Sequence, residues 1–354
     1  MKILFVGPLS PPIHGQSLAF TRFYESIDNN NKLLINTNIT TNKALNTVKN
    51  LVLIFSKLFL HKIDTVYFTC SRSISGSIKD ILLITLASFK GIRLVNHLHG
   101  SDFYEFLHRS PTWYQHLLIN AYGKVDTSIV LLDEMREQFK DFPTMNIVVV
   151  PNFYDEDLDT ELISKDTSYI TILYLSNIIK SKGIFELINA FNALTKKYDN
   201  IVLNIAGTFM ADIYMSKEKV EQQFLQQIKN NPKIKYLGTV QGKDKIELLQ
   251  RSDLFVLPSY YPSEAFPISI IEAMRSGNAI ITTDYKYLPN IVKPKNEVLV
   301  EIKSVSSLIT GIERLLEDPI RLHTIQEHNI KTAKENYTLA HYLDQLKKIV
   351  LENT

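Results

Sequence analysis

The sequence contains one cysteine, Cys70, and no run of about 20 apolar residues. A single cysteine forms neither an intrachain disulfide nor a thiolate metal site, which fits a reducing cytosol. Without such an apolar run, we expect no membrane-spanning helix. The apolar residues at the start, Met1–Val6, end at Gly7-Pro8 and are too few for a secretory signal. These features predict a cytoplasmic protein.

Acidic residues are scarce in one part of the chain. The formal net charge is +2, which gives no indication of a nucleic-acid partner. Between Asn29 and Ser101, however, the only acidic residues are Asp64 and Asp80, among nine lysines and arginines. Such a basic region favours an anionic partner such as the lipid head groups on the inner face of a cell membrane. The alternative interpretation is a scatter of solvated lysines over several helices.

The chain has 354 residues, of which 45% are hydrophobic, enough for two globular domains. Short apolar runs predict buried strands, and helical periodicity follows most of them. The predicted strands are residues 2–6, 65–70, 92–97, 127–132 and 146–150 in the first half, and 170–175, 201–207, 234–238, 254–259 and 279–283 in the second. This alternation predicts an α/β fold with two doubly wound, Rossmann-like domains.

Residues 48–60 predict an amphipathic helix with apolar residues at 48, 51, 52, 55, 58 and 59. We expect this stripe to pack against the core of the first sheet. Because Lys49, Lys57 and Lys62 flank the stripe, a helix lying on a membrane surface is the alternative.

The most informative stretch is residues 260–277, YYPSEAFPISIIEAMRSG. Glu264 follows a buried strand, and Glu272 lies in the helix that Pro267 begins and Gly277 ends. In an α/β sheet, ligands bind at the carboxyl ends of the strands, and a helix N-terminus there suits a phosphate. Carboxylates beside it suit sugar hydroxyls instead. The combination indicates a nucleotide sugar, although two glutamates alone would also fit a solvated surface helix.

This stretch resembles the signature of retaining glycosyltransferases of family four, in which seven residues separate two glutamates. The resemblance implies the GT-B fold, in which two Rossmann-like domains face an interdomain cleft. Residues 151–155 (PNFYD) are similar to the family's interdomain segment, and the polar residues 155–168 then read as a linker. We expect domains at 1–164 and 165–337, with a C-terminal helix, 338–354, that packs back on the first domain.

Polar residues follow the predicted strand 92–97, where His97 and His99 precede Gly100. Two histidines at i and i+2 could hold a metal, but the sequence places no third ligand, and we predict no metal site. The HGSD sequence at 99–102 resembles the family's His-Gly element, which implies that His99 contacts the transferred sugar. A plain turn after the strand is the alternative.

The resemblance also implies the donor-binding residues. Lys182 matches the family's Lys-Gly element and would contact the diphosphate, whereas Asn177 replaces the usual arginine. Lys180, without such a match, reads as a solvated lysine. The expected donor contacts are Gly15, Asn177, Lys182, Leu237, Val240, Glu264, Ala265, Phe266, Pro267, Ile268 and Glu272. The catalytic residues would be His99, Glu264 and Lys182, with Glu272 on the ribose.

The sequence thus predicts a retaining glycosyltransferase that needs neither cofactor nor metal. The acceptor would be a hydroxyl of a lipid-linked saccharide in surface polysaccharide synthesis, or a soluble acceptor. Two other functions stay open: a nucleotide-sugar epimerase of similar fold, and a two-domain protein that binds a nucleotide sugar without chemistry. The lack of a signal peptide argues against the usual exported form of such a binding protein.

Overall fold

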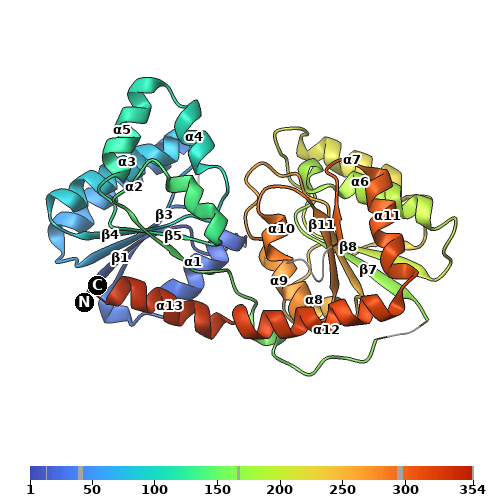
Figure 1. Cartoon of the computed structure of the whole chain (residues 1–354). Coiled ribbons are helices and arrows are strands. Elements are labelled where there is room, and N and C mark those ends of the chain that lie inside the picture. Colours follow the sequence, from blue (N-terminus) through green and yellow to red (C-terminus); the bar gives the residue numbers. More distant parts are fainter. Residues whose placement is uncertain (13, 39–42, 166–167, 293–297, 353–354) are drawn as a thin grey trace. The chain divides into compact units, whose positions relative to one another are not determined.

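A computed structural model of the protein describes residues 1–12, 14–38, 43–165, 168–292 and 298–352 (Figure 1). The chain divides into two compact units, each built around a six-stranded sheet whose strands all pair in parallel. Unit 1 comprises Met1–Asn152 and Ala340–Thr354, and unit 2 comprises Phe153–Leu339. The predicted α/β class with two Rossmann-like sheets is confirmed.

Unit 1 has the strand order β2-β1-β3-β4-β5-β6. Its strands are β1 (Ile3–Gly7), β2 (Lys32–Asn36), β3 (Thr65–Thr69), β4 (Arg93–His97), β5 (Thr127–Val130) and β6 (Asn146–Val149). Its helices are α1 (Gly15–Glu25), η1 (Asn29–Asn31), α2 (Lys43–Leu60), α3 (Ile74–Phe89), α4 (Phe103–Arg109), α5 (Thr112–Tyr122), η2 (Asp133–Phe139) and most of α13 (Leu339–Leu351). Every residue of β1 and β3 is buried, as expected for parallel strands covered on both faces.

Aromatic side chains form the centre of the unit 1 core. The ring of Phe5 on β1 meets those of Phe20 and Phe23 on α1 edge to face, with centroids 5.9 and 5.4 Å apart. Tyr67 on β3 joins the cluster. Gly7 is the last residue of β1, and the position requires glycine because a Cβ there would lie 2.4 Å from the ring of Phe20. The first strand and first helix are therefore held closely together below the loop that connects them.

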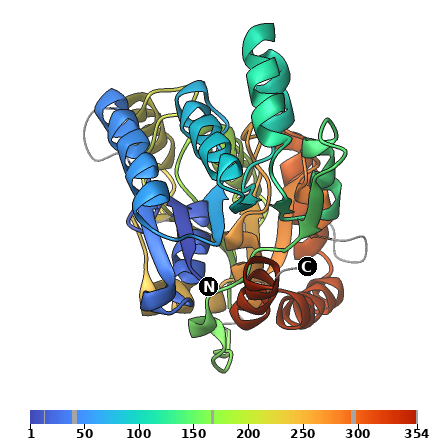
Figure 2. The same ribbon diagram turned by 90° about the vertical axis from the view of Figure 1, so that its left-hand side faces the viewer.

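Three helices of unit 1, α2, α3 and α5, lie side by side (Figure 2). The apolar stripe predicted on α2 was expected to pack on the core, and this expectation is wrong. Val48, Val52, Phe55 and Phe59 are exposed, whereas Leu58 of the stripe is buried. Ile54, which lies off the stripe, is fully buried. The helix is rotated so that most of its apolar stripe faces solvent.

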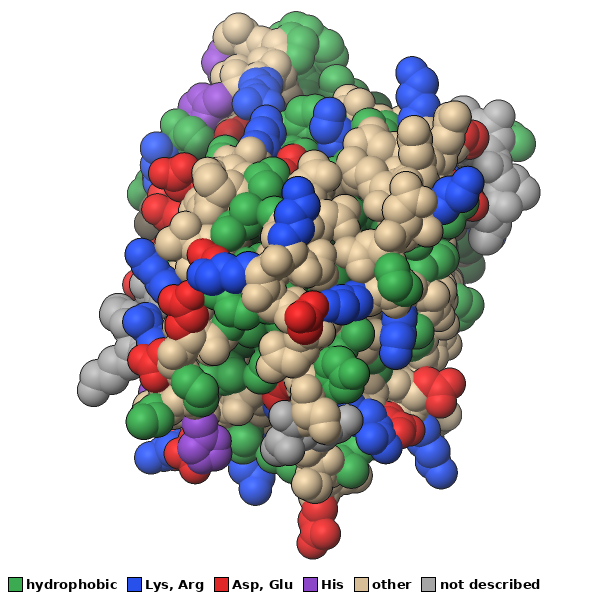
Figure 3. Space-filling view, turned by 90° about the vertical axis from the view of Figure 1, so that its right-hand side faces the viewer, with side chains coloured by type: hydrophobic (Ala, Val, Ile, Leu, Met, Phe, Trp, Pro, Cys, Tyr) green, Lys and Arg blue, Asp and Glu red, His purple; other side chains and the backbone are tan. Residues whose placement is uncertain are grey.

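Unit 2 has the strand order β12-β11-β10-β7-β8-β9. Its strands are β7 (Ile170–Leu175), β8 (Ile201–Ala206), β9 (Ile234–Tyr236), β10 (Leu254–Leu257), β11 (Ala279–Thr283) and β12 (Val298–Val300). Its helices are η3 (Glu156–Leu158), η4 (Lys180–Lys182), α6 (Ile184–Leu194), α7 (Lys217–Ile228), α8 (Gly242–Gln250), α9 (Ile268–Arg275), α10 (Leu288–Ile291), α11 (Val305–Leu316) and α12 (Pro319–Asn336). On the face shown in Figure 3, positive and negative side chains are intermixed.

The strand order of unit 2 reverses at β7, whose neighbours are β8 on one side and β10 on the other. At such a reversal the connections leave in opposite directions, and a crevice opens at the carboxyl ends of the two strands. The loop after β7 carries the predicted Lys182, and β10 is followed by the loop with Glu264 and by α9 (Ile268–Arg275) with Glu272. The topology therefore brings the two sequence motifs to the same point of the sheet.

Contacts place the start of unit 2 at Phe153, whereas the sequence predicts a boundary at 164. The intervening residues pack on unit 2. Asp159 accepts a 2.9 Å hydrogen bond from Nε of Arg275, and Thr160 accepts one of 3.0 Å from the amide of Gln250. The polar composition that indicated a linker instead reflects side chains bonded to the surface of unit 2. No helix in the described parts of the chain has the length and apolarity to cross a membrane.

Candidate active site

The loop after β7 packs tightly against the end of β10. Gly183 has a φ of +75°, and a Cβ there would lie 2.1 Å from the carbonyl oxygen of Pro258, so no other residue fits without a shift. The backbone N–H of Tyr260 donates a 2.7 Å hydrogen bond to the carbonyl of Ser181. These contacts hold the two loops together, and Lys182 lies in the first of them.

Lys182 and Glu264 form a nearly buried ion pair. The Lys182 Nζ lies 2.6 Å from Oε2 of Glu264, and their side chains are only 13% and 7% exposed. The hydroxyl of Ser259 donates a 2.5 Å hydrogen bond to the same carboxylate oxygen. Because a charge buried without a partner is costly, each group holds the other in place. An anionic ligand here would compete with Glu264 for the lysine.

The helix that follows Glu264 offers its N-terminus to the same region. α9 begins at Ile268, one residue later than predicted, with Pro267 as its N-cap. No side chain caps this end, although the N–H of Ile270 already donates to the carbonyl of Pro267. The helix dipole favours negative charge at this end. Ala265 and Phe266, which precede it, are buried, and Gly277 (φ +75°) follows its last turn as predicted.

Glu272 is buried inside α9 and paired with a lysine that the sequence analysis did not identify. Its Oε1 lies 2.6 Å from Nζ of Lys245, on α8. Burial raises the pKa of Glu272, while Lys245 opposes that rise and Asp155 adds to it. Lys245 therefore favours the ionised carboxylate, the form that accepts hydrogen bonds from hydroxyl groups.

The predicted base-binding residues lie after β9. Leu237 is 41% exposed although it is apolar, and Val240 is half-buried. Nearby, the hydroxyls of Thr208 and Thr239 lie 2.7 Å apart, which joins the ends of β8 and β9. Asn177, predicted in place of an arginine, is exposed on the loop after β7. These residues surround the same edge of the unit 2 sheet.

Asp212 and Ser259 are further residues of unit 2 that the sequence analysis missed. One carboxylate oxygen of Asp212 accepts a 2.7 Å hydrogen bond from the N–H of Ser181, and the other accepts from Tyr214 and Met215. Asp212 thereby ties the loop after β8 to the turn that carries Lys182. Neither residue has a sequence signal, because both act through contacts between distant segments.

In unit 1, the carboxyl end of β4 carries His99. The residue is half-buried, yet both ring nitrogens are shielded from solvent and have no hydrogen-bond partner among the described residues. Burial, together with smaller effects of the nearby Arg72 and His14, lowers the pKa of His99 to about 3. Arg72 pairs with Asp102 and lies over Gly100, where a Cβ would meet its guanidinium at 1.8 Å. The imidazole is therefore neutral at physiological pH.

His97, the other histidine considered for a metal, points its Nδ1 to the hydroxyl of Tyr67, 2.7 Å away. Its ring stacks on that of His99 with centroids 4.0 Å apart, and burial lowers its pKa. No group of three metal-ligand side chains occurs in the parts of the chain that the structure describes. His97 thus acts as a support for the ring of His99.

Gly15 is the first residue of α1, after the loop that leaves β1. His14 is the N-cap: its Nδ1 accepts from the N–H of Ser17 at 3.2 Å, and its own N–H donates to the Ser17 hydroxyl at 3.0 Å. His14 therefore has a structural role, because it caps the start of α1.

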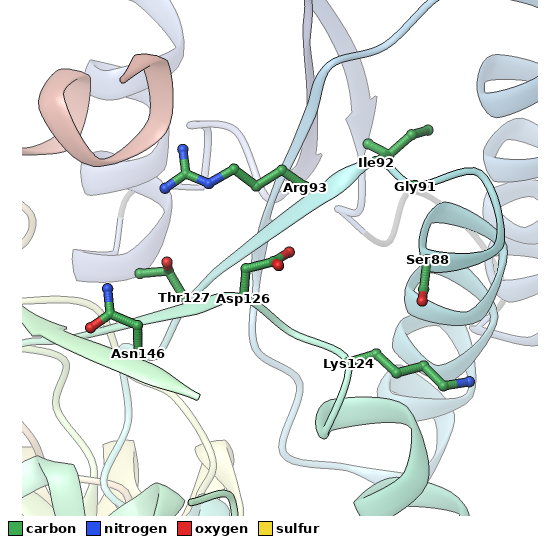
Figure 4. Close-up of a pocket in the computed structure, with 8 residues that line it drawn as sticks. All are labelled: Ser88, Gly91, Ile92, Arg93, Lys124, Asp126, Thr127 and Asn146. Carbon is green, nitrogen blue, oxygen red and sulfur yellow. The ribbon is translucent and has the colours of Figure 1, made fainter. Parts of the chain in front are cut away.

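A separate hollow of about 470 Å³ lies at the opposite edge of the unit 1 sheet, beside the amino ends of β4, β5 and β6. In Figure 4 the side chains of Arg93 and Lys124 extend away from one another, and Asp126 lies between them. Asp126 accepts a hydrogen bond from the N–H of Leu94, so it serves the backbone of β4. The polar groups do not converge on a ligand position.

Comparison with known proteins identifies the class that this fold and site define. Residues 155–335, just over half of the chain, match the family of glycosyl transferases group 1. The chain belongs to this family. The match covers nearly all of unit 2, including Lys182, Glu264 and Glu272.

Relatives and solved structures agree with this assignment. The chain is 38% identical over 90 residues, 25% of its length and 23% of the relative's, to an N,N'-diacetylbacillosaminyl-diphospho-undecaprenol alpha-1,3-N-acetylgalactosaminyltransferase of Campylobacter jejuni. It is 29% identical over 164 residues to a capsular polysaccharide biosynthesis glycosyltransferase of Staphylococcus aureus, covering 46% of this chain and 40% of that one. Against the first curated relatives it matches, the chain spans 33% to 42% of their length.

Two solved structures share the whole fold. Sucrose-phosphate synthase from Thermosynechococcus elongatus matches with a TM-score of 0.77 at 13% identity, over 99% of this chain and 98% of that one. Anabaena HepE in complex with UDP matches with a TM-score of 0.74 at 16% identity, over 99% of both chains. At these identities the likeness shows the fold alone.

Proposed function

We propose that the protein is a retaining glycosyltransferase that moves a sugar from a nucleotide donor to a hydroxyl group. One observation carries the proposal: a nearly buried Lys182–Glu264 pair stands beside an uncapped helix N-terminus where the strand order of unit 2 reverses. A cation and a helix dipole suit a departing diphosphate, and a carboxylate suits sugar hydroxyls. The membership of the chain in the group 1 family supports this assignment.

The donor is a nucleoside diphosphate sugar. Lys182 and the first N–H groups of α9 receive the diphosphate, and the ionised Glu272 accepts hydrogen bonds from the ribose hydroxyls. Leu237 and Val240 contact the base, and Asn177 lies beside the phosphates. Since HepE is described in complex with UDP, UDP-sugars are the first donors to test.

Donor binding exchanges one partner for another at Lys182. In the free protein its ammonium group is neutralised by Glu264, so an incoming diphosphate takes over the cation. Glu264 is then free to orient hydroxyls of the transferred sugar, and its negative charge favours the cationic transition state of glycosyl transfer. We also assign a role to His99 of unit 1, whose neutral imidazole suits contacts with sugar hydroxyls.

The number of carboxylates that we assign to the sugar decides between two routes to retention. A double displacement needs two carboxyl groups about 5 Å apart across the scissile bond. Glu272 is committed to ribose, which leaves Glu264 alone. We therefore propose that the acceptor attacks on the face from which the diphosphate leaves. The anomeric configuration of the product, measured by NMR, tests retention, which both routes share.

The reaction needs no divalent metal in this proposal, because Lys182 and the α9 N-terminus supply the positive charge at the leaving group. Activity that persists in excess EDTA supports this statement. Activity that is lost with EDTA and restored by Mg²⁺ or Mn²⁺ contradicts it.

The acceptor is a lipid-linked saccharide in the assembly of a surface polysaccharide. The name of the Campylobacter relative contains a diphospho-undecaprenol carrier, and the Staphylococcus relative is named for capsular polysaccharide biosynthesis. An acceptor of this kind stays in a membrane, so we also propose that the protein works as a peripheral protein on the inner face of the cell membrane.

A single experiment tests the function. The protein is incubated with radiolabelled UDP-, GDP- and ADP-sugars and a lipid extract, and the products are separated. Label in the lipid fraction supports the proposal. Label in water-soluble oligosaccharide would indicate a soluble acceptor, label in a donor isomer would indicate an epimerase, and unchanged donor would indicate binding without chemistry.

A further inference from the structure

Helix α2 carries its apolar side chains on the outside. Its exposed face presents Leu45 (66% exposed), Val48 (59%), Val52 (62%), Phe55 (55%) and Phe59 (46%). The buried face carries two polar side chains, Asn46 and Asn50, before Ile54 and Leu58. A helix that only covers a sheet has the opposite arrangement. The sequence of α2 therefore serves something beyond the core of unit 1.

The two neighbouring helices also expose large apolar side chains. α3 contacts α2, and α5 contacts α3. The large apolar side chains exposed on α3 and α5 are Ile74 (55%), Ile78 (42%), Phe89 (86%), Trp113 (66%), Leu117 (46%) and Ile119 (39%). Figure 2 shows the three helices on one side of the sheet. We call this surface the α2–α3–α5 face. Scattered single apolar residues are normal, but a broad set on adjacent helices marks an interaction surface.

The charged side chains that these three helices present to solvent are all basic. The only acidic residue in the three helices is Asp80, which is fully buried and accepts hydrogen bonds from the Ser71 N–H and the Tyr122 hydroxyl. Lys49 and Lys90 are exposed beside the apolar side chains. Nζ of Lys90 lies 4.8 Å from the ring centroid of Phe59, so cation and aromatic ring are presented together. The partner must therefore accept apolar insertion and be anionic at its surface.

We propose that the α2–α3–α5 face docks on an anionic phospholipid bilayer, with α2 lying in the interface. Apolar side chains enter the acyl boundary, and the lysines meet lipid phosphates. Phe55, Phe59, Phe89 and Trp113 supply aromatic rings at that depth. The proposal deepens the proposed function, because it names the surface at which a lipid-linked acceptor would be met. It concerns binding, however, and needs no donor or acceptor.

A second copy of the chain is the main rival for this face. Positions 45, 48, 52, 55 and 59 alternate by three and four residues, which is also the spacing of a coiled-coil seam. Such seams are flanked by charges of both signs, which pair between helices. α2 offers lysines alone, so two copies would bring like charges together. The charge pattern favours lipid over self-association.

The test is flotation of the full chain with vesicles, in the absence of nucleotide sugar. One set is phosphatidylcholine alone, and the other is phosphatidylcholine with an equal part of phosphatidylglycerol. The variant is Val52→Ser/Phe55→Ser, and the matched control is Ile213→Ser/Ile320→Ser on unit 2, where the side chains are 79% and 82% exposed. Because all four positions are exposed, circular dichroism should show intact folding in every protein.

We expect binding to the anionic vesicles that weakens as salt is added. Val52→Ser/Phe55→Ser should reduce the partition coefficient by at least about tenfold, and the control double variant should leave it unchanged. Lys49→Gln should reduce it by about fivefold on anionic vesicles alone. Equal binding of both double variants, or no binding to either vesicle, would overturn the proposal while leaving glycosyl transfer untouched. A dimer in sedimentation that Val52→Ser/Phe55→Ser dissociates would overturn it in favour of self-association.

Discussion

The buried polar side chains at the carboxyl edges of the two sheets differ in their charge. In unit 2, Glu264 and Glu272 are buried as carboxylates, each with its own lysine at 2.6 Å. In unit 1, the ring of His99 is buried with no hydrogen-bond partner among the described residues, and its low pKa keeps it neutral. A buried ion must be paired, whereas a buried neutral imidazole needs no counter-charge. The two edges are therefore suited to different parts of a substrate.

This contrast indicates which half is prepared for ionic chemistry. In unit 2, a charged ligand can enter by exchanging partners with an existing ion pair, and Glu264, released from Lys182, is then left to bind hydroxyl groups of the same ligand. In unit 1, a ligand finds a neutral donor and acceptor, which suits sugar hydroxyls. Variants that remove single charged or titratable side chains from one unit at a time test this contrast.

The largest effect is expected from Glu264→Gln, which keeps the shape of the side chain and removes its charge. Lys182 then lacks a counter-ion in a nearly buried position, and breaking such a pair costs about 3 to 5 kcal/mol. We expect kcat to fall by on the order of 10²-fold to 10³-fold because transition-state charge is no longer stabilised. Transfer of labelled sugar and thermal unfolding measure the two effects. Glu247→Gln, whose partner Arg251 is exposed, is the control and should change neither.

Lys182→Ala should slow turnover by on the order of 10²-fold, because the departing diphosphate loses its cation. Its effect on donor binding should be smaller. Lys180→Ala, on the same short turn, is the matched control. Since Lys182 and Glu264 contact one another, the double variant should lose less activity than the sum of the single losses. Strict additivity in stability and rate would show that the pair does not act as a unit.

The sequence was sufficient for most of the buried strands and for the glutamate helix. Residues 254–257 (LFVL) are apolar and buried throughout, as expected for a parallel strand covered by helices on both faces. β2 was missed because its residues are half-buried and polar at both ends. The helices α4 and α5 were missed as well. An apolar run in the sequence indicates a buried element, so elements at the surface are harder to predict.

The orientation of helices and the contacts between them could not be predicted from apolar periodicity. A repeat of apolar residues at helical spacing shows that α2 has a stripe, but not whether the stripe faces the sheet. The observed orientation of α2 requires that Asn46 and Asn50 be buried. Similarly, Lys245 and Glu272 are 27 positions apart, and they meet only because α8 and α9 pack side by side. Which side chains meet between two helices depends on how each helix is rotated about its axis, and a local sequence pattern does not determine this rotation.

Glu272→Ala should weaken donor binding by about tenfold or more, since hydrogen bonds to a charged group contribute about 1.5 to 3 kcal/mol each. kcat at saturating donor should change little, because ribose contacts are the same before and during transfer. Calorimetry with a nucleoside diphosphate measures the affinity without turnover. A variant that lost kcat and kept donor affinity would reverse the roles of Glu264 and Glu272.

Lys245→Met should have a smaller effect at neutral pH and a larger one in acid. Burial already raises the pKa of Glu272, and Lys245 opposes the rise. Without the lysine the pKa rises further, so the carboxylate is protonated at higher pH and donor affinity is lost sooner as pH falls. The groups that face Glu272 electrostatically are Lys245 and Asp155, and Asp155 remains in the variant. Donor affinity measured against pH should therefore fall at higher pH in Lys245→Met, and Lys245→Arg should restore the wild-type curve.

The smallest effect at neutral pH is expected from His99→Gln on stability. The pKa of His99 in the folded protein is about 3, against an ordinary value of 6.5. The unfolded chain therefore binds more protons between those values, and the free energy of unfolding falls as pH decreases through that window. His99→Gln should flatten this fall and leave stability at pH 8 within about 1 kcal/mol of wild type, because little else is lost there. Urea unfolding at several pH values measures it, with His323→Gln, which is 71% exposed, as the control. Parallel curves for His99→Gln and wild type would mean that His99 has the same pKa in the folded protein as in the unfolded chain, and the contrast between the two edges would fail.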